Sequence, residues 1–369
     1  MHIDKLDVYY VVMPLIYPWR TAYGEDADIH SVLVKATSGE NEAWSESTPF
    51  FAPTYLNESA GSVFYHVSEV LGPYVVGREY ETAAELNERL RIFKGNSFAK
   101  AAIEIGWWTL QSSITATPVH QLLGGKTRDV VAGADFGIQD SYDMLLGNIQ
   151  KAVDTGFPRI KLKAAKGWDL EMLQIVTKTF PDMTFHIDCN SGYSLDEDLP
   201  FFKAIDDMGL AFIEQPLHYT DILDHAELAK QIGTPICLDE TIVDPRSAEQ
   251  AIRIGACHYI NIKPGRIGGL SNALAVHDMA RDAGIPVWIG GMLESAVGAS
   301  ICVELATLKN FTYPGDLFPS SRFYHRDLSE PSMEFSEGHI FKPFTDGLPA
   351  PNPELLAGQS LRQKTVTAA

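Results

Sequence analysis

Two lysines stand one residue apart in an apolar run of this 369-residue chain, within the segment "RIKLKAAKG" at 159–167. Because strand side chains alternate between two faces, Lys161 and Lys163 must point the same way, and their neighbours mark that strand as buried. A crowded pair of amines disfavours the charged form, and a neutral amine is a base. The pair therefore predicts a lysine that takes up protons, beside a second lysine that lowers its proton affinity.

The ends of the later apolar runs recur with a nearly constant spacing, and five of these seven positions hold charged residues. The run ends are Ile138, Lys163, Asp188, Glu214, Asp239, Lys263 and Trp288, separated by 25, 25, 26, 25, 24 and 25 residues. Three carboxylates at one level of neighbouring strands cannot share a site without a cation. A set of oxygen ligands favours Mg²⁺, or Mn²⁺ as the alternative, over zinc. We therefore expect Asp188, Glu214 and Asp239 to bind Mg²⁺.

Lysines flank this predicted metal site. In an eight-stranded barrel, strands two and six lie opposite each other, so Lys163 and Lys263 would face each other across the metal. A carboxylate substrate would then present its α-carbon between two amines, which suits racemisation and also elimination. The enediolate left by proton removal needs strong stabilisation from a divalent metal and a nearby cation. Lys161 would supply that cation beside Lys163, and Arg266 would act in the same way on Lys263.

A repeat of βα units must position these residues. From about residue 127, short apolar runs such as "TFHIDC" and "AFIEQP" alternate with amphipathic helices. Repeated βα units imply parallel strands, and seven or eight of them close a barrel with its active site at the carboxyl ends of the strands. The rival is an open doubly wound sheet, which usually has a glycine-rich turn after its first strand. Here "FGIQDSYD" follows the first strand and is not such a turn.

The chain divides into three predicted parts. Residues 1–126 show strand patterns and then helical patterns, which predicts a small α+β capping domain. Residues 127–320 form the catalytic barrel, and residues 321–369 are expected to return to the capping domain. The strand patterns lie near 3–13, 29–37 and 40–46, and the helical patterns near 58–73, 79–93, 97–113 and 117–123. The last residues, "RQKTVTAA", are expected to be loose.

Composition narrows the class of partner. The formal net charge of −19 argues against a nucleic-acid or anionic-membrane surface, because both attract positive charge. The N-terminal segment reads as neither a signal peptide nor a membrane span, and the 4 cysteines show no CxxC pairing. We therefore expect a cytoplasmic protein whose partner is a small-molecule carboxylate, with no nucleic acid and no membrane.

Six short segments together resemble the muconate-lactonizing subgroup of the enolase superfamily. They are "KLK" at 161–163, "DCN" at 188–190, "EQP" at 214–216, "LDET" at 238–241, "NIKPGRIGG" at 261–269 and "GGMLES" at 290–295. Within the subgroup the chain is most similar to the o-succinylbenzoate synthase/N-succinylamino acid racemase family. "KGWD" at 166–169, Arg266 and "GGMLES" carry this closer resemblance.

The resemblance implies a modified TIM barrel, (β/α)₇β, with an α+β capping domain. It implies Asp188, Glu214 and Asp239 as Mg²⁺ ligands, Lys163 and Lys263 as the acid/base pair, and Asn190 as a support of the ligands. Loops 18–25 and 50–58, which carry Tyr23 and Tyr55, would cover the pocket and touch the substrate. The implied reaction is racemisation of an N-acyl (N-succinyl) amino acid, or dehydration to o-succinylbenzoate. Both stay open because they share the lysines and the enediolate. We also expect a homo-oligomer, a dimer or an octamer.

Neighbouring activities differ at several of these positions. Dipeptide epimerases usually carry a DxD pair on the last barrel strand, and "GGMLES" lacks it. Mandelate racemase-like enzymes use a His–Asp pair where this chain has Lys263. Muconate cycloisomerase shares the core segments and stays an alternative, as does another racemase or epimerase of the subgroup with an unusual substrate. A non-catalytic scaffold has no need of two opposed lysines around three acids, so we disfavour it.

One residue departs from the family pattern. The family's first barrel strand ends in a small polar residue, usually serine, where "VAGADFGI" places Asp135, with Gly133 and Gly137 expected to leave room for a substrate. Three interpretations are open: Asp135 pairs with Lys161, it binds a donor or cation on an unusual substrate, or it faces outward.

The roles of two residues of "GGMLES" are also open. Glu294 is structural, orients a lysine or touches substrate, and Met292 lines the pocket or belongs to the core.

Overall fold

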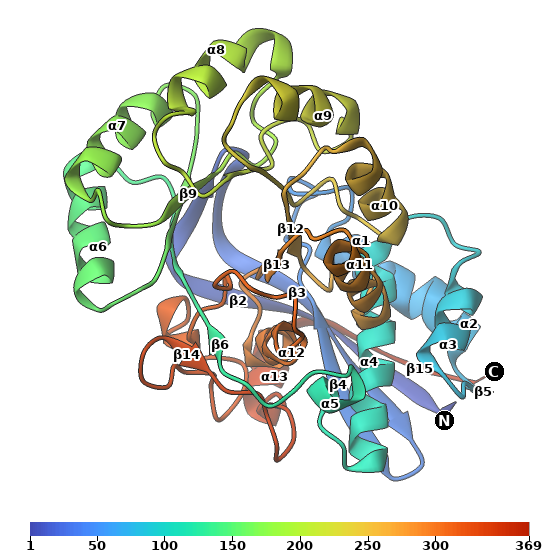
Figure 1. Ribbon diagram of the computed structural model, residues 1–369. Helices are drawn as coiled ribbons and strands as arrows, with labels where there is room; N and C mark the ends of the chain where they lie inside the picture. The colour runs from blue at the N-terminus through green and yellow to red at the C-terminus, as the bar shows by residue number, and fades with distance from the viewer. Residues whose placement is uncertain (369) are drawn as a thin grey trace.

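Parallel strands with helices between them occupy the middle of the chain in the computed structural model, which describes residues 1–368. These elements are β6 (Val130–Val131), β7 (Ala134–Phe136), α6 (Tyr142–Asp154), β8 (Ile160–Lys163), α7 (Asp169–Thr179), β9 (Phe185–Asp188), α8 (Leu195–Ile205), β10 (Ile213–Glu214), α9 (Ile222–Gln231), β11 (Ile236–Leu238), α10 (Pro245–Ile254), β12 (Tyr259–Ile262), α11 (Leu270–Asp282), β13 (Val287–Ile289) and α12 (Ala296–Ala306). Figure 1 shows helices α6 to α11 in an arc around the strands. Each βα crossover returns the chain to the same end of the sheet, which keeps the strands parallel.

The strands form one curled sheet in the order β7-β8-β9-β10-β11-β12-β13. An eighth segment, 311–316, closes the ring, because Asp316 bridges to Gly290 after β13 and Gly315 bridges to Ala132 before β7. The architecture is therefore the predicted modified TIM barrel, in which seven βα units are followed by one more extended segment. The carboxyl ends of all these strands open on the same side, where active sites of this architecture lie.

The predicted place of the last barrel strand was wrong. "GGMLES" follows the seventh strand, β13, and the last position of the ring belongs to segment 311–316. This segment contains Pro314 and Gly315 and makes only isolated bridges, so it lacks the apolar run by which strands are recognised. Its Asp316 is followed two places later by Phe318, so the true last segment also has no DxD pair.

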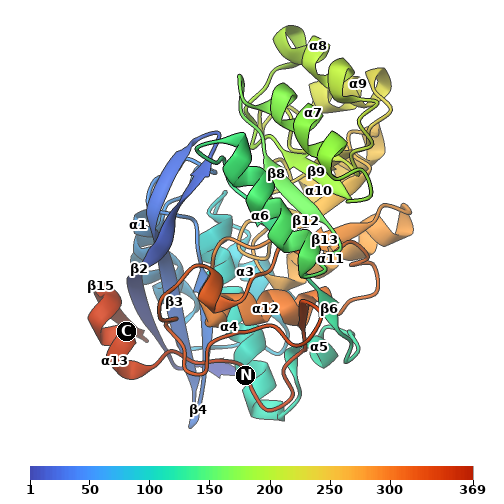
Figure 2. The ribbon, with the colours of Figure 1, turned by 90° about the vertical axis from the view of Figure 1, so that its left-hand side faces the viewer.

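Elements from both ends of the chain build the cap. The N-terminal ones are β1 (His2–Ile3), β2 (Lys5–Thr21), β3 (Gly24–Ser38), β4 (Asn41–Ser47), α1 (Ala60–Tyr65), the π-helical η1 (His66–Leu71), α2 (Gly72–Val75), β5 (Arg78–Glu79), α3 (Ala83–Leu90), α4 (Ser97–Thr115) and α5 (Val119–Leu122). At the C-terminal end, α13 (Pro353–Gln359) and β15 (Ser360–Thr367) pack against β2 of the cap. The short η2 (Ser320–Arg322) precedes them, and β14 (Ile340–Phe341) instead pairs antiparallel with β6 of the barrel. Figure 2 shows the long strands of the cap beside the barrel.

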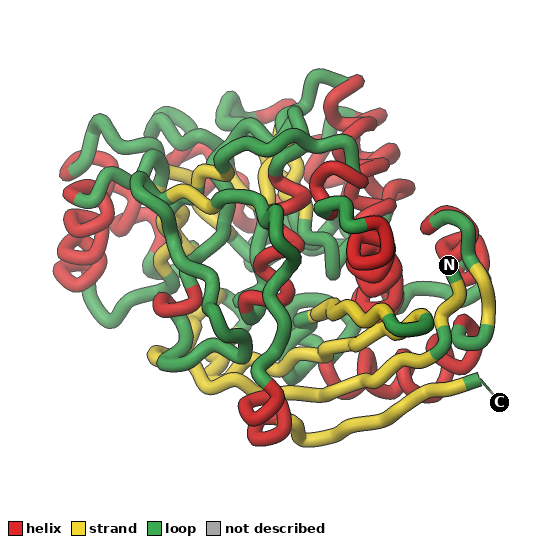
Figure 3. The backbone as a smooth tube through the Cα atoms, turned by 90° about the horizontal axis from the view of Figure 1, so that it is seen from below, coloured by secondary structure: helices red, strands yellow, loops and turns green. Residues whose placement is uncertain are grey.

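Residues 362–367 of the C-terminal segment that was expected to be loose belong to a strand, and Ala369 lies outside the described residues. β15 pairs antiparallel with β2 from Ser360 opposite Val11 to Thr367 opposite Lys5, giving the sheet order β15-β2-β3-β4. Figure 3 shows these strands lying side by side. Val366 is 3% exposed and packs in the core of the cap, so a sequence that looks polar and terminal is held by long-range pairing. The predicted boundaries at residues 126 and 320 stay a prediction.

Buried carboxylates of the cap bind the amino ends of barrel helices. Glu104 on α4 accepts hydrogen bonds from the main-chain nitrogens of Leu270 (2.7 Å) and Ser271 (3.0 Å) at the start of α11. Glu46 on β4 accepts from the nitrogens of Ser295 (3.2 Å) and Gly298 (2.9 Å) at the start of α12. A negative charge is stabilised at a helix amino end, so these contacts fix the cap over the barrel mouth. No helix in residues 1–368 is long and apolar enough to cross a membrane.

Candidate active site

The buried Lys161 joins three carboxylates at the centre of the barrel. Its Nζ lies 2.9 Å from Asp188, 2.9 Å from Glu214 and 3.1 Å from Asp316. Burial opposes the charge of Lys161, but these carboxylates outweigh it and hold the pKa of the lysine well above its usual value. Lys161 is therefore a fixed positive charge in this arrangement, and its role in catalysis stays a prediction.

Lys163, on the same face of β8, contacts a carboxylate and an amide. Its Nζ donates to Asp188 Oδ2 (2.7 Å) and to Asn190 Oδ1 (3.2 Å). The amide of Asn190 donates in turn to Glu240 Oε1 (3.2 Å), and its main-chain nitrogen donates to Asp188 Oδ1 (2.9 Å). Asn190 thus contacts the carboxylate and the lysine at once.

Lys263 reaches the interior from β12 and contacts a different carboxylate. Its Nζ donates to Asp239 Oδ2 (2.9 Å) and to the Tyr55 hydroxyl (3.2 Å). Tyr55 comes from the cap, and its hydroxyl donates to Asp239 Oδ1 (2.9 Å) while accepting from Arg266 Nη1 (3.1 Å). Arg266 also pairs with Asp239. A cap tyrosine and a barrel arginine therefore hold the same carboxylate as the lysine.

The three predicted metal ligands stand at the carboxyl ends of adjacent strands. Asp188 ends β9, Glu214 ends β10 and Asp239 follows β11, with Asp188 and Glu214 paired in register. Among residues 1–368 no three acidic, histidine or cysteine side chains are gathered closely enough to hold a metal ion, and the ammonium of Lys161 lies between Asp188 and Glu214. Glu214 Oε2 is buried and accepts no hydrogen bond in good geometry. Lys161 Nζ lies 2.9 Å from this oxygen, so it is in contact with an ammonium group. The donor set itself, three buried carboxylates, fits Mg²⁺.

Unusual backbone geometry occurs just beyond these strand ends. Asn190 (φ 43°), Ser191 (φ 62°) and Gln215 (φ 38°) adopt left-handed conformations that non-glycine residues rarely take. The side-chain oxygen of Gln215 accepts from the nitrogens of Asp239 (3.0 Å) and Thr241 (3.1 Å), so the strained residue ties two strand ends together. Such strain is typical of functional sites, where surrounding bonds maintain it.

A cavity of about 220 Å³ opens between the cap and the ends of β9 to β11. Tyr23 and Tyr55 line it from the two predicted covering loops, and Asn190 and Glu240 line it from the barrel. Burial and the nearby Asp188 raise the pKa of Glu240 to about 7. Burial also raises the pKa of Tyr55 to about 12, so its hydroxyl keeps its proton at neutral pH. The cavity therefore reaches Asn190 and Glu240, which are sequence neighbours of the predicted ligands Asp188 and Asp239.

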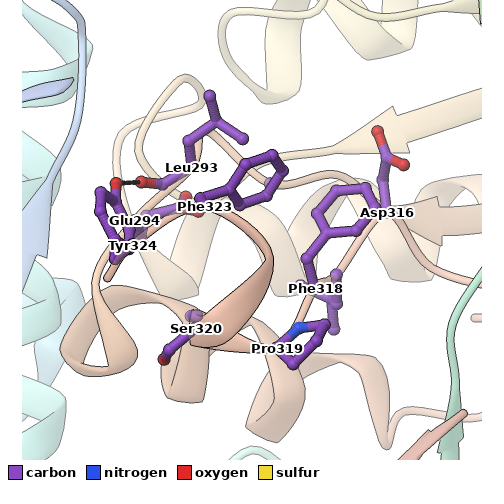
Figure 4. Close-up of a pocket in the computed structure, with 11 residues that line it drawn as sticks. Leu293, Glu294, Asp316, Phe318, Pro319, Ser320, Phe323 and Tyr324 are labelled. Atoms are coloured by element: carbon purple, nitrogen blue, oxygen red, sulfur yellow. Dashed lines mark hydrogen bonds between the residues drawn. The ribbon is translucent and has the colours of Figure 1, made fainter. Parts of the chain in front are cut away.

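The residues of "GGMLES" lie on the opposite side of the mouth. A smaller cavity there has a volume of about 20 Å³. Glu294, Asp316, Phe323 and Tyr324 are among the residues that line it (Figure 4). Glu294 Oε2 accepts from the nitrogen of Met292 (2.8 Å), and burial raises the pKa of Glu294 to about 7. Met292 is 3% exposed and packs in the apolar cluster of the cap, which favours the core interpretation of this residue.

Asp135 faces the interior but does not pair with Lys161. It stands in register with Lys161 on the neighbouring strand, so both point into the barrel, and it is 3% exposed. The outward interpretation and the Lys161 pair were therefore wrong, the latter because Lys161 is taken up by other carboxylates. Burial and Asp316 raise the pKa of Asp135 to about 6. Its neighbouring glycines leave no room either, because Arg159 fills the space at Gly133 and the Arg20 carbonyl meets Gly137.

Sequence patterns missed three charged residues of the site. Asp316 lies on the irregular eighth segment and contacts Lys161 and Arg159. Arg159 is buried at the start of β8, and its guanidinium donates to the carbonyls of Ala134 (2.8 Å) and Gly315 (2.6 Å). Glu240 directly follows Asp239, and that position in "LDET" was the one signal available in the sequence.

Comparison with known proteins agrees with this geometry. Residues 5–124 match the mandelate racemase/muconate lactonizing enzyme N-terminal domain, and residues 145–349 match the enolase C-terminal domain-like family. The chain therefore belongs to the mandelate racemase/muconate lactonizing family of the enolase superfamily, and it is an enzyme of the racemase and lyase type found there.

The relatives narrow this class. An N-succinylamino acid racemase from Amycolatopsis is 40% identical over 358 residues, covering 96% of this chain and 97% of that protein. An o-succinylbenzoate synthase from Geobacillus kaustophilus is 37% identical over 349 residues, covering 94% and 93%. The crystal structure of an enolase-superfamily member from Listeria innocua superposes with a TM-score of 0.93 at 31% identity, covering 100% of this chain and 99% of that one.

Proposed function

We propose that this enzyme removes the proton α to a carboxylate with the help of Mg²⁺, or Mn²⁺ as the alternative. The reaction is either racemisation of N-acyl amino acids or dehydration of a cyclohexadiene precursor to o-succinylbenzoate. The observation that carries the proposal is the placement of two lysines on opposite strands of the ring. Lys163 holds Asp188 from β8, and Lys263 holds Asp239 from β12. A substrate α-carbon between them meets an amine on each face, which is what proton transfer from one face to the other requires.

The residues of this chain have distinct parts in the proposal. Asp188, Glu214 and Asp239 would hold the metal, and a dipeptide epimerase of the same fold is known as a complex with Mg. The ion would supply Lewis-acid stabilisation of charge on the substrate carboxylate. Lys163 and Lys263 take or give the α-proton, each at its Nζ. Lys161 remains charged and stabilises the negative charge that develops when the proton leaves.

The names of the relatives support the substrate class. Relatives at 37–40% identity over almost the whole chain are an N-succinylamino acid racemase and an o-succinylbenzoate synthase. Both reactions begin by removing a proton next to a carboxylate, so one arrangement of lysines serves either. Muconate cycloisomerisation, the alternative left by the sequence, has no specific contact in its favour. The small-molecule carboxylate partner, the homo-oligomer and the cytoplasmic location stay predictions.

Exchange of the α-proton with solvent tests the proposal directly. N-Succinyl and N-acetyl amino acids would be incubated with the protein and Mg²⁺ in D₂O, and loss of the α-proton signal would be followed by NMR for each enantiomer. We expect exchange with Mg²⁺, and none after EDTA treatment until the metal is restored. o-Succinylbenzoate formation would be followed alongside by its absorbance. No exchange on a broad panel of acyl amino acids, together with no o-succinylbenzoate, would refute the proposal.

A further inference from the structure

Asp135 has a buried carboxylate oxygen with no hydrogen-bond donor. The side chain is 3% exposed, points into the barrel beside Lys161, and its Oδ1 is without a partner among residues 1–368. Burying an acceptor without a donor costs free energy, because the oxygen loses its hydrogen bonds to water. Such an atom beside the predicted acid/base lysines therefore needs a specific explanation.

The cations around Asp135 are engaged elsewhere. Lys161 lies against Asp188, Glu214 and Asp316. Lys163 donates to Asp188 and Asn190. Arg159 donates to main-chain carbonyls and to Asp316. Arg322 donates to the main-chain oxygen of Asp135 (2.9 Å) and not to its carboxylate.

Neighbouring groups also prevent a ligand from approaching Asp135 past the glycines on either side of it, Gly133 and Gly137. A side chain at Gly133 would collide with the Arg159 guanidinium, and one at Gly137 would meet the Arg20 carbonyl. The remaining side is the barrel interior, where Lys163 and Lys263 point. In the ring of eight, β7 lies opposite β11, which leads to Asp239. When a substrate carboxylate lies toward the metal ligands, its α-substituents extend away from them, toward the part of the ring that includes β7.

We propose that Asp135 Oδ1 accepts a hydrogen bond from an N–H group on one α-substituent of the substrate, and so selects acyl amino acids that carry such a donor. The inference rests on the proposed function and specifies its substrate. The donor lies either on the acyl arm, as in a carbamoyl or aminoacyl group, or on the amino-acid side chain, as an amine. A substituent ending in a carboxylate, such as succinyl, meets like charge at this position and is handled less well.

Two pairs of near-isosteric substrates test the proposal. N-Carbamoyl and N-acetyl derivatives of one amino acid differ by an NH₂ in place of a methyl group, which examines the acyl arm. N-Acetyl-lysine and N-acetyl-norleucine differ by the terminal ammonium, which examines the side chain. The measurement is kcat/KM for α-proton exchange by the Mg²⁺-loaded enzyme, for wild type, Asp135→Ser and Asp135→Asn. Asp129→Asn, at an exposed position before β6, is the matched control for the change in charge.

We expect wild type to prefer the donor-bearing member of one pair by about tenfold or more, as for one hydrogen bond to a charged acceptor. The preference should fall severalfold in Asp135→Ser and Asp135→Asn and stay unchanged in Asp129→Asn, while exchange of N-succinyl substrates rises in both Asp135 variants. The pair that shows the preference identifies the arm that carries the donor.

Equal rates within both pairs for wild type overturn the inference and leave the proposed function standing. Preferences that persist in a folded Asp135 variant also overturn it. No exchange with any substrate overturns the inference, and if o-succinylbenzoate formation is absent as well, the proposed function is overturned with it.

Discussion

Lys163 and Lys263 enter the barrel from strands four places apart in the ring, and each ammonium holds a different carboxylate. Lys163 Nζ lies 2.7 Å from Asp188, and Lys263 Nζ lies 2.9 Å from Asp239. The two contacts keep the lysines separate from one another, on either side of the ligand set. This separation leads to predictions that treat the lysines as two bases with different partners.

Removing one lysine should stop racemisation without stopping all proton exchange. Lys163→Ala should lower racemisation in both directions by about a hundredfold or more, because one of two proton carriers is gone. Exchange should persist for the enantiomer whose proton faces Lys263, and Lys263→Ala should show the opposite enantiomer preference. Exchange in D₂O, followed by NMR for each enantiomer, measures both. Lys166→Ala, at an exposed lysine of the following loop, is the control. Full activity of Lys263→Ala would contradict the two-base scheme.

Removing one predicted ligand charge should weaken metal binding. Asp239→Asn should reduce Mg²⁺ affinity and lower turnover by about a hundredfold or more, since a charged oxygen ligand is lost. Calorimetric titration with Mg²⁺ measures binding separately from turnover, and Asp207→Asn, at an exposed acid, is the control. Mg²⁺ binding equal to that of wild type, or turnover that is insensitive to EDTA, would contradict the assignment.

Tyr55 should act mainly through Lys263. Its hydroxyl contacts Lys263, Asp239 and Arg266, and it has no contact of this kind with Lys163. Tyr55→Phe removes one hydrogen bond from each partner, so we expect a fall of about tenfold in the proton transfers that use Lys263. Primary isotope effects on the two directions of exchange separate the lysines. An equal loss in both directions would indicate a general disturbance of the cap loop.

Stability should depend on pH through the buried His225. This histidine accepts a hydrogen bond from the nitrogen of Leu217 (3.2 Å), and burial lowers its pKa to about 4. Between pH 4 and 6.5 the unfolded chain binds the extra proton more readily than the folded one. The contribution of the neutral His225 to the free energy of unfolding is therefore complete above pH 6.5. It is lost as the pH falls toward 4, and the total loss is about 3 kcal/mol. Denaturant unfolding of wild type and His225→Gln measures it, and parallel pH curves would contradict the prediction.

The C-terminal strand should contribute to stability through its buried side chain. Val366 is 3% exposed and Leu361 is 63% exposed on the same strand, β15. Val366→Ala should lower the free energy of unfolding by about 2 kcal/mol, because two buried carbon atoms are lost. Leu361→Ala should change it by less than about 0.5 kcal/mol. Equal effects in urea unfolding would show that β15 does not pack as described.

The sequence alone determined which residues share the edge of the barrel. A period of 24–26 residues places Lys163, Asp188, Glu214, Asp239 and Lys263 at successive strand ends. The period is local, since each strand and helix carries its own apolar pattern, and parallel strands align their carboxyl ends whatever the later packing. The fold class follows from the same repeat.

Only the tertiary structure decided what these residues contact. Lys161 is held by Asp316, which is 155 residues away on an irregular segment without a strand pattern. Tyr55 reaches Lys263 across 208 residues, and β15 joins the strand at the other end of the chain. Asp135 lost its predicted partner because Lys161 was already surrounded by three other carboxylates. Such contacts depend on which groups compete for one donor in the folded chain, and no local pattern in the sequence records that competition.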